Sequence, residues 1–227
     1  MTLPGRTVGL VGGTGPFGRG FALRAAAAGW AVVIGSRDPA RGAAAAAALE
    51  RPAVRGAGNA EAVRAADLVV VAVPWEAHAA VLREVAPLLD GRLVLDVTVP
   101  FAPDAPGGLA PAAARAFAEE TQAAAPTARV VAGFHTVAAS TLGRTERPLD
   151  QDVLLCGDDA GARRTVAELV EAFGGRPVEC GPLAAARALE GFGALVTALA
   201  VRRRRAVGVR LTNLAPRPAA PPSPPAS

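Results

Sequence analysis

Short apolar runs alternate with alanine-rich, amphipathic stretches along most of the chain. Apolar runs bounded by glycine, proline or polar residues are typical of strands covered on both faces, whereas longer stretches with apolar residues every three or four positions are typical of helices. The pattern predicts strands at 7–11, 31–34, 67–74, 92–99, 129–134, 152–156 and 176–180. It predicts helices at 17–28, 38–49, 60–66, 76–89, 110–124, between 159 and 174, and at 183–203.

This alternation of strand and helix indicates an α/β fold, with a Rossmann-like, doubly wound and mostly parallel sheet. The last third of the chain differs in character, so we expect a nucleotide-binding domain at 1–135 and a smaller C-terminal α/β domain at 136–214. The proline-rich residues 215–227 cannot pack a core and are expected to be disordered. The apolar side of the helix at 183–203 is expected to consist of Leu189, Phe192, Leu195, Val196 and Leu199.

The turn after the first predicted strand carries a glycine-rich motif. Gly13, Gly15 and Gly18 occupy the positions of a G-x-G-x-x-G sequence between a strand and a helix. The first glycine allows the tight turn, the second lets a pyrophosphate approach the backbone, and the third lets helix and strand pack closely. The helix N-terminus adds amide groups that favour an anion. The sequence therefore predicts a dinucleotide site.

The end of the second predicted strand indicates which dinucleotide is bound. Sites that prefer NAD usually place Asp or Glu there, to bind the ribose hydroxyls. This chain has Ser36 and Arg37 instead, followed by Arg41 about one helical turn later. A hydroxyl and two guanidinium groups suit a 2'-phosphate, so we expect NADP in preference to NAD. The alternative is that Arg37 and Arg41 are solvated loop charges.

Composition narrows the function further. The 227 residues are 51% hydrophobic and 19% charged, with a formal net charge of +4, which indicates a globular protein. The arginines are spread along the chain, so we expect no nucleic-acid partner. Arg202 to Arg205 form a cluster at a helix end, where cations complement the helix dipole. The apolar run Phe192 to Val201 is too short to span a bilayer, and no signal peptide is evident, so we expect a cytoplasmic protein without a membrane partner.

The histidines and cysteines exclude several kinds of site. The two histidines lie far apart and no metal-ligand spacing is present, so no metal site is expected. No G-x-S-x-G motif is present. Cys156 and Cys180 lie in apolar surroundings and are expected to be reduced, buried and inert. With a metal site and a hydrolase of the G-x-S-x-G class excluded, redox chemistry is the reaction type that remains.

His135 is the candidate catalytic residue, because it follows a predicted strand end where a nicotinamide or its acceptor could lie. The alternative is a purely structural histidine. His78 is interpreted as a surface or packing residue. Pro74 and Trp75 follow another strand end and either contact the cofactor or, in the case of Trp75, fill the interface between helix and sheet.

Seven segments in order resemble the NADPH:coenzyme F420 oxidoreductases, which pass a hydride between NADP and an 8-hydroxy-5-deazaflavin. They are the strand and loop at 8–24 with VGGTGPFGRGFALR, VIGSR at 33–37, VAVPWE at 71–76, FHTVAAS at 134–140, DVLLCGDD at 152–159, CGPLAAARALE at 180–190 and AVGVRLTNL at 206–214. The resemblance covers the chain up to Leu214. Hydride transfer of this kind needs two rings stacked about 3 to 3.5 Å apart, water excluded and hydrogen bonds placed around them.

The resemblance also implies the residues of the site and a homodimer. NADP would be held by Gly13, Thr14, Gly15, Pro16, Phe17, Gly18, Ser36, Arg37 and Arg41. The nicotinamide or deazaflavin would be faced by Val73, Pro74, Trp75, His135, Thr136, Val137 and Ala138. The segment from Gly208 to Leu211 would approach the deazaflavin, with Arg210 meeting an anionic group of it. Arg187 and Glu190 match the family without an evident role.

Two alternative functions remain open from the sequence. One is an NADPH-dependent reductase that uses a flavin, or reduces a metal ion through a flavin, since related domains do this. The other is a regulator that binds NADP without turnover. The FHT segment and the complete C-terminal segment argue against a sensor, which has no need of a second ring pocket.

Overall fold

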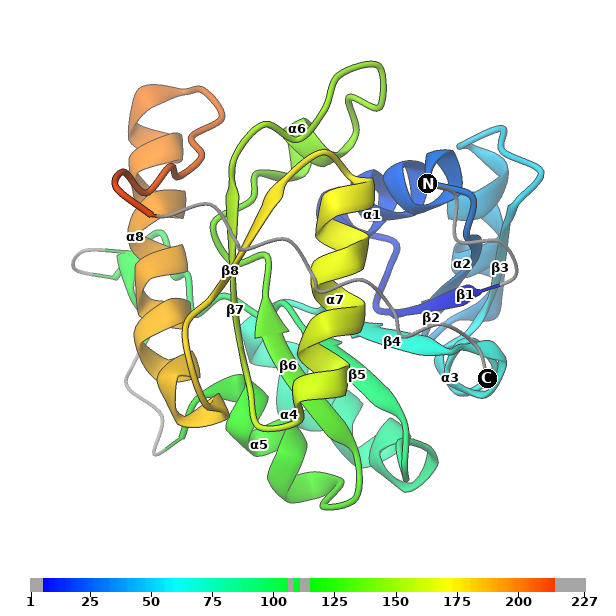
Figure 1. The fold of residues 1–227 in the computed structure, drawn as a ribbon. Helices are drawn as coiled ribbons and strands as arrows, with labels where there is room; N and C mark the ends of the chain where they lie inside the picture. The colour runs from blue at the N-terminus through cyan, green and yellow to red at the C-terminus, as the bar shows by residue number, and fades with distance from the viewer. Residues whose placement is uncertain (1–5, 106–107, 111–114, 215–227) are drawn as a thin grey trace, which may run out of the picture.

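The computed structural model describes residues 6–105, 108–110 and 115–214 and contains a single eight-stranded sheet within them (Figure 1). The order of the strands is β3-β2-β1-β4-β5-β6-β7-β8. Their bounds are β1 Thr7–Val11, β2 Ala31–Ser36, β3 Val54–Gly58, β4 Leu68–Val71, β5 Leu93–Asp96, β6 Arg129–Gly133, β7 Asp152–Gly157 and β8 Arg176–Glu179. The predicted tail at 215–227 lies outside the described residues.

Helices cover both faces of the sheet. The α-helices are α1 Pro16–Ala27, α2 Pro39–Ala47, α3 Asn59–Ala65, α4 Trp75–Val85, α5 Phe117–Ala124, α6 Ala139–Leu142, α7 Ala160–Ala172 and α8 Ala186–Arg203. Two 3-10 turns, η1 Ala86–Leu88 and η3 Leu183–Ala185, extend α4 and precede α8. Side chains from α1, α2, α6 and α7 pack on one face, and side chains from α3, α4 and η3 with the start of α8 pack on the other.

The strand order confirms the predicted fold class. All neighbouring strands are parallel except β6 and β7, which are antiparallel. The chain winds outward in one direction from β1 through β2 to β3 and then in the other direction from β4, so β1 lies at the switch point where α/β sheets bind ligands. β7 and β8 continue the same sheet. The predicted domain boundary at residue 135 stays a prediction.

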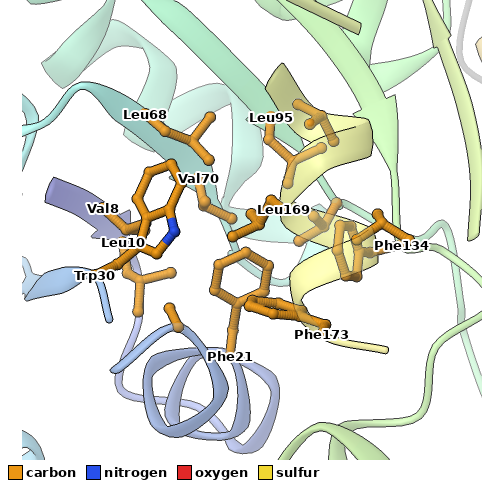
Figure 2. Close-up of a cluster of buried hydrophobic side chains, with 14 of the residues drawn as sticks. Val8, Leu10, Phe21, Trp30, Leu68, Val70, Leu95, Phe134, Leu169 and Phe173 are labelled. Carbon is orange, nitrogen blue, oxygen red and sulfur yellow. The ribbon is translucent and has the colours of Figure 1, made fainter. Parts of the chain in front are cut away.

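An aromatic cluster fills the core between α1, α7 and the sheet (Figure 2). The Phe21 ring meets the edges of Phe134 and Phe173, with centroids 5.4 Å apart in each pair. Offset and edge-to-face pairs of this kind add about 0.5 to 1.5 kcal/mol beyond the burial of their area. Phe134 has a positive φ of 65°, and the turn that it makes delivers His135 to the ligand edge of the sheet.

Arg24 of α1 is a buried cross-link in this half of the molecule. The Nε, Nη1 and Nη2 atoms of its guanidinium group donate to five backbone carbonyls, at distances of 2.6 to 3.1 Å. The acceptors are Thr141, Leu142, Arg144, Arg147 and Phe173. One side chain therefore holds α1, the loop after α6 and the end of α7 together.

One strand was not predicted, and one predicted helix has other bounds. β3 was missed because its sequence is rich in glycine, and Gly56 is needed where Gly42 of α2 lies against it. Of the helix predicted at 110–124, residues 111–114 lie outside the described residues, and α5 begins at Phe117, where Glu190 accepts the N–H groups of Phe117 and Ala118.

The predicted apolar side of α8 is wrong in part. Leu189 and Val196 are buried, but Leu195 and Leu199 are 60% and 40% exposed. The helix instead packs through a small residue: a Cβ added at Gly193 would lie 2.7 Å from the Cβ of His135. Because the backbone of α8 lies close to His135 at Gly193, Leu195 and Leu199 face away from the sheet.

Candidate functional site

The glycine turn has the geometry that the motif predicts. Gly12 has a positive φ of 72°, and its N–H donates to the Asn59 side chain at 3.2 Å. The Gly13 N–H donates to the Gly35 carbonyl at 3.0 Å, which closes the turn. A Cβ at Gly18 would overlap the Gly13 carbonyl, whereas a Cβ at Gly15 would meet nothing within 4 Å. The first turn of α1 is thus packed tightly against the glycine turn at Gly18, while the backbone at Gly15 is open to a ligand.

The end of β2 carries unpaired positive charge. Ser36 is buried, and its hydroxyl accepts the Asp38 N–H at 3.3 Å. Arg37 and Arg41 are exposed, and neither side chain has an ion pair or hydrogen bond in the part of the chain that the structure describes. Both guanidinium groups are therefore available to a phosphate.

A cavity of about 420 Å³ opens beside this glycine turn. Its walls come from the start of α1, from the segments that follow β4, β5 and β6, and from the last turns of α8. These segments lie where the strands end, as expected for a ligand site in a parallel sheet. Apart from His135, Thr136 and Thr197, its lining side chains are apolar or glycine. The cavity suits planar rings better than a charged group.

His135 is the polar side chain in this wall that lacks a partner. It is 3% exposed, and neither ring nitrogen has a hydrogen-bond partner in residues 6–105, 108–110 and 115–214. Burial lowers the pKa of His135 to about 4, although the charge of Asp96 and the nearby Thr98 backbone, which does not reach hydrogen-bond geometry with either ring nitrogen, oppose this shift. The ring is therefore neutral at physiological pH and offers one donor and one acceptor. A buried group without a partner costs about 1 to 3 kcal/mol, which a ligand can recover.

A buried polar network that the sequence analysis missed lies behind the cavity. Asp96 ends β5, and its carboxylate accepts from the Thr98 N–H at 2.9 Å, the Thr121 hydroxyl at 2.7 Å and His78 Nε2 at 3.0 Å. Burial alone would raise the pKa of Asp96, but these bonds and the charge of His78 hold it well below its usual range. Burial alone would lower the pKa of His78, but the hydrogen bond to Asp96 and the negative charge of Asp96 outweigh this effect, so the pKa of His78 is raised. An aspartate inside the apolar run LVLDVTV was the signal available in the sequence.

Glu190 links α8 to this network. Its two carboxylate oxygens accept the N–H groups of Phe117 and Ala118 at 3.0 and 3.1 Å. Burial raises the pKa of Glu190 to about 7, although these two bonds oppose the shift. The bonds join α8, whose later turns line the cavity, to the start of α5.

A pH dependence of stability follows from Glu190. Between about pH 4.5 and 7 the folded protein keeps the Glu190 proton that the unfolded chain loses. The contribution of Glu190 to the free energy of unfolding is therefore expected to fall as the pH rises through this range, by on the order of 2 to 3 kcal/mol, whereas His135, with its pKa lowered to about 4, contributes in the opposite direction in wild type and variant alike. Urea unfolding of wild type and Glu190→Gln at several pH values measures the effect. The free energy of unfolding of wild type minus that of the variant should fall by this amount across the range, and equal slopes in the two proteins would refute the assignment.

The structure brings ten of the predicted site residues to the cavity. They are Gly15, Pro16, Phe17, Gly18, Val73, Pro74, His135, Thr136, Val137 and Ala138. Gly13 and Thr14 lie in the adjoining turn, while Ser36, Arg37 and Arg41 lie at the end of β2 and the start of α2. Trp75 does not line the cavity, because its indole N–H donates to the Phe101 carbonyl at 3.1 Å.

The predicted role of Arg210 does not match its position. Its exposed guanidinium pairs with Asp150, and it does not line the cavity. The chain around it is fixed to the start of β7: the Asp152 N–H donates to Val209 at 2.8 Å, and its carboxylate accepts the Leu211 N–H at 2.6 Å. Val207, at the beginning of this segment, does line the cavity.

The remaining candidate residues are not part of the site. His78 is fully buried, so its interpretation as a packing residue holds and a surface position is excluded. Both cysteines are free, but Cys180 is exposed, contrary to prediction, because it directly follows β8, the strand at the edge of the sheet. No group of three metal-ligating side chains occurs within the described ranges.

One stretch, Leu183–Arg203, is long and apolar enough by length and composition to cross a membrane. A third of it is buried inside the structure, and α8 packs on the sheet and lines the cavity. These features are those of a core helix that is partly exposed.

Comparison with known proteins decides the family. A family model described as NADP oxidoreductase, coenzyme F420-dependent, matches residues 7–100. The F420-dependent NADP reductase of Methanothermobacter thermautotrophicus is 36% identical over 228 residues, which cover 91% of this chain and 95% of that protein. The chain belongs to the F420-dependent NADP reductase family. The resemblance of the seven sequence segments is thereby confirmed.

Solved structures agree with this membership of the F420-dependent NADP reductases. A protein assigned to the same activity from Arthrobacter sp. FB24 superposes with a TM-score of 0.78 at 30% identity, covering 89% of this chain and 96% of that one. The metalloreductase STEAP3 of Rattus norvegicus is 32% identical over 178 residues, but these are only 34% of its length. The relationship to that protein is distant and partial.

Proposed function

We propose that this protein is an oxidoreductase that transfers a hydride between NADP(H) and the deazaflavin coenzyme F420. Membership of the F420-dependent NADP reductase family supports both coenzymes. The single structural observation that carries the proposal is the apolar cavity beside the glycine turn, with the unpartnered His135 in its wall. When bound, the two coenzymes supply the hydride donor and the hydride acceptor.

The residues present fit these coenzymes. The open N-terminus of α1 at Gly15 offers amides to a pyrophosphate, and the free guanidinium groups of Arg37 and Arg41 suit a 2'-phosphate. The apolar walls after β4, β5 and β6 exclude water from the rings. His135 can donate or accept one hydrogen bond with a bound ring, from a cavity wall that is otherwise mostly apolar. The protein binds, orients and dehydrates the two rings, and no nucleophile is needed.

A steady-state assay tests the proposal. Purified protein is given NADPH together with F420, FAD or FMN, and NADPH oxidation is followed. We expect oxidation with F420 that exceeds the rates with FAD and FMN by at least tenfold. Faster oxidation with a flavin would favour the flavin or metal reductase, and binding of NADPH without any oxidation would favour the sensor.

Replacing His135 by alanine is expected to slow hydride transfer about three- to tenfold, which corresponds to one lost hydrogen bond. The ratio of wild-type to variant rates should be constant from pH 5.5 to 8, because the pKa of His135 is about 4. Single-turnover rates measure both effects. His135→Gln, which retains a donor and an acceptor, should recover most of the rate. An unchanged rate in His135→Ala would remove the residue from the site.

We also propose that the protein is a homodimer in the cytoplasm, with the outer face of α8 as the interface. Leu195 and Leu199 are exposed on this helix, while Val196, Ala200 and Val201 of the same turns line the cavity. A second copy would cover this apolar face. Leu195→Glu is expected to halve the mass measured by light scattering, while the exposed control Glu171→Gln on α7 leaves it unchanged. A monomeric wild type would exclude the interface.

A further inference from the structure

Four consecutive arginines form a turn where α8 ends. Arg202 and Arg203 close the helix, Arg204 has a left-handed backbone with φ of 50°, and Arg205 follows. All four are exposed, and none of their side chains has an ion pair or hydrogen bond within the described residues. The segments outside the described residues, 1–5, 106–107, 111–114 and 215–227, contain no Asp or Glu in their sequence. We call residues 202–205 the arginine turn, and no acidic side chain of the described chain neutralises it.

The arginine turn lies at the edge of the cavity. Val201 before it and Val207 after it both line the cavity. The Arg204 N–H donates to the Val201 carbonyl at 3.1 Å, and the Arg205 N–H donates to the Ala200 carbonyl at 3.2 Å. Figure 1 shows the segment after α8 turning back alongside the helix. The backbone that carries the four arginines therefore lies at the border of the pocket proposed for the two rings.

The chain that follows the arginine turn is also held in place, by hydrogen bonds to the starts of β7 and β8. The Asp152 carboxylate accepts from Arg176 through two bonds of 2.7 and 2.6 Å, and it also accepts the Leu211 N–H. Arg176 donates in addition to the Leu211 carbonyl at 2.7 Å. The returning chain is thus anchored to the first residues of β7 and β8. The arginine turn is held between this anchor and the end of α8.

The helix dipole accounts for only part of the cluster. It favours cations in the last turn, which covers Arg202 and Arg203, and its effect falls off beyond that turn. Arg204 and Arg205 lie outside the helix, and four adjacent like charges repel one another. A polyanion bound at the cavity edge would relieve this repulsion. Guanidinium groups bind phosphate and carboxylate oxygens through paired hydrogen bonds.

We propose that the arginine turn is the subsite for the anionic tail of the deazaflavin substrate, that is, its phosphodiester and its glutamate carboxylates. The inference rests on the proposed function, because it takes the ring of that substrate to lie in the cavity. The arginine turn then contributes to the affinity for the charged substrate and not to the hydride-transfer step. Since the charges are exposed, their contribution decreases as the salt concentration rises.

The test compares two acceptors that share one ring. The first is F420, and the second is the same deazaflavin with its ribityl chain alone, which lacks the phosphate and glutamates. The variant Arg202→Gln, Arg203→Gln, Arg205→Gln keeps the left-handed Arg204. We expect its KM for F420 to rise about tenfold at low salt, as three exposed ion pairs allow. Its KM for the tail-less acceptor and for NADPH should stay within twofold, and the difference from wild type should shrink at high salt.

A charge-matched control removes three exposed arginines away from the cavity, by Arg51→Gln, Arg83→Gln and Arg164→Gln. It should leave every KM unchanged. An equal rise in KM for both acceptors, or no rise for F420, would overturn the subsite. If wild-type protein reduces neither acceptor, the proposed function fails, and a fluorescence titration with F420 then decides the subsite. A tenfold weaker Kd in the triple variant alone supports it, and equal Kd values exclude it.

Discussion

The double variant Arg37→Ala, Arg41→Ala is expected to raise the KM for NADPH between about 10- and 100-fold and to leave the KM for NADH within threefold. The two guanidinium groups lie at the end of β2 and in α2, and neither forms an ion pair or hydrogen bond within the described residues, since the neighbouring Asp38 carboxylate caps α2. Charge-assisted hydrogen bonds are worth about 1.5 to 3 kcal/mol each, and exposure to solvent reduces this value. Steady-state kinetics with each dinucleotide, at a saturating concentration of acceptor, measure the effect.

Arg55→Ala is the control for this change. Arg55 lies on the neighbouring strand β3 and is also exposed, but it is already paired with Glu61 at 2.6 Å. Its replacement should leave both KM values unchanged. Equal increases for NADPH and NADH in the double variant would show that Arg37 and Arg41 contact a part common to both dinucleotides, and the assignment to a 2'-phosphate would be lost.

Replacing Arg24 by methionine is expected to lower the free energy of unfolding by about 3 to 5 kcal/mol. The change leaves five backbone carbonyls without their donor, and each unsatisfied buried group costs about 1 to 3 kcal/mol before the chain relaxes. Removing one side of a buried charged network typically has this magnitude. Urea unfolding followed by circular dichroism gives the difference, provided that the slope with denaturant is unchanged.

Arg19→Met serves as the comparison, since Arg19 lies in the same helix and its side chain donates one bond within the described residues, to the Thr14 carbonyl at 3.0 Å. A loss below about 1 kcal/mol is expected there. If Arg24→Met unfolds no more easily than Arg19→Met, the five bonds do not hold α1 and α7 together.

The sequence predicted those parts of the molecule that depend on local pattern. Continuous apolar runs identified the buried parallel strands, and the glycine spacing identified the turn at Gly13 to Gly18, because each glycine there answers a local steric demand. His135 was found because it follows a strand end, where parallel sheets bind ligands. The strand β3 was missed because its glycines serve contact with α2, which hydrophobic periodicity does not report.

Features that depend on contacts between distant residues could not be predicted. Glu190 lies 73 positions from Phe117, whose N–H it accepts, and Arg24 lies 149 positions from Phe173. The outward direction of Leu195 depends on Gly193 packing against His135, which the period of α8 alone does not determine. In each case a partner in the folded chain, and not local propensity, sets the role of the residue.

Direct hydride transfer between two rings held in one cavity is the central claim, and stopped-flow mixing with NADPH deuterated at the transferred position tests it. The protein is mixed with this NADPH and oxidised F420, and the visible band of the deazaflavin is followed. We predict a single phase of bleaching, stoichiometric with NADPH oxidation, slowed at least twofold by deuterium, with the label recovered in the reduced deazaflavin. Bleaching without the label in the product, or no bleaching at all, would contradict the account.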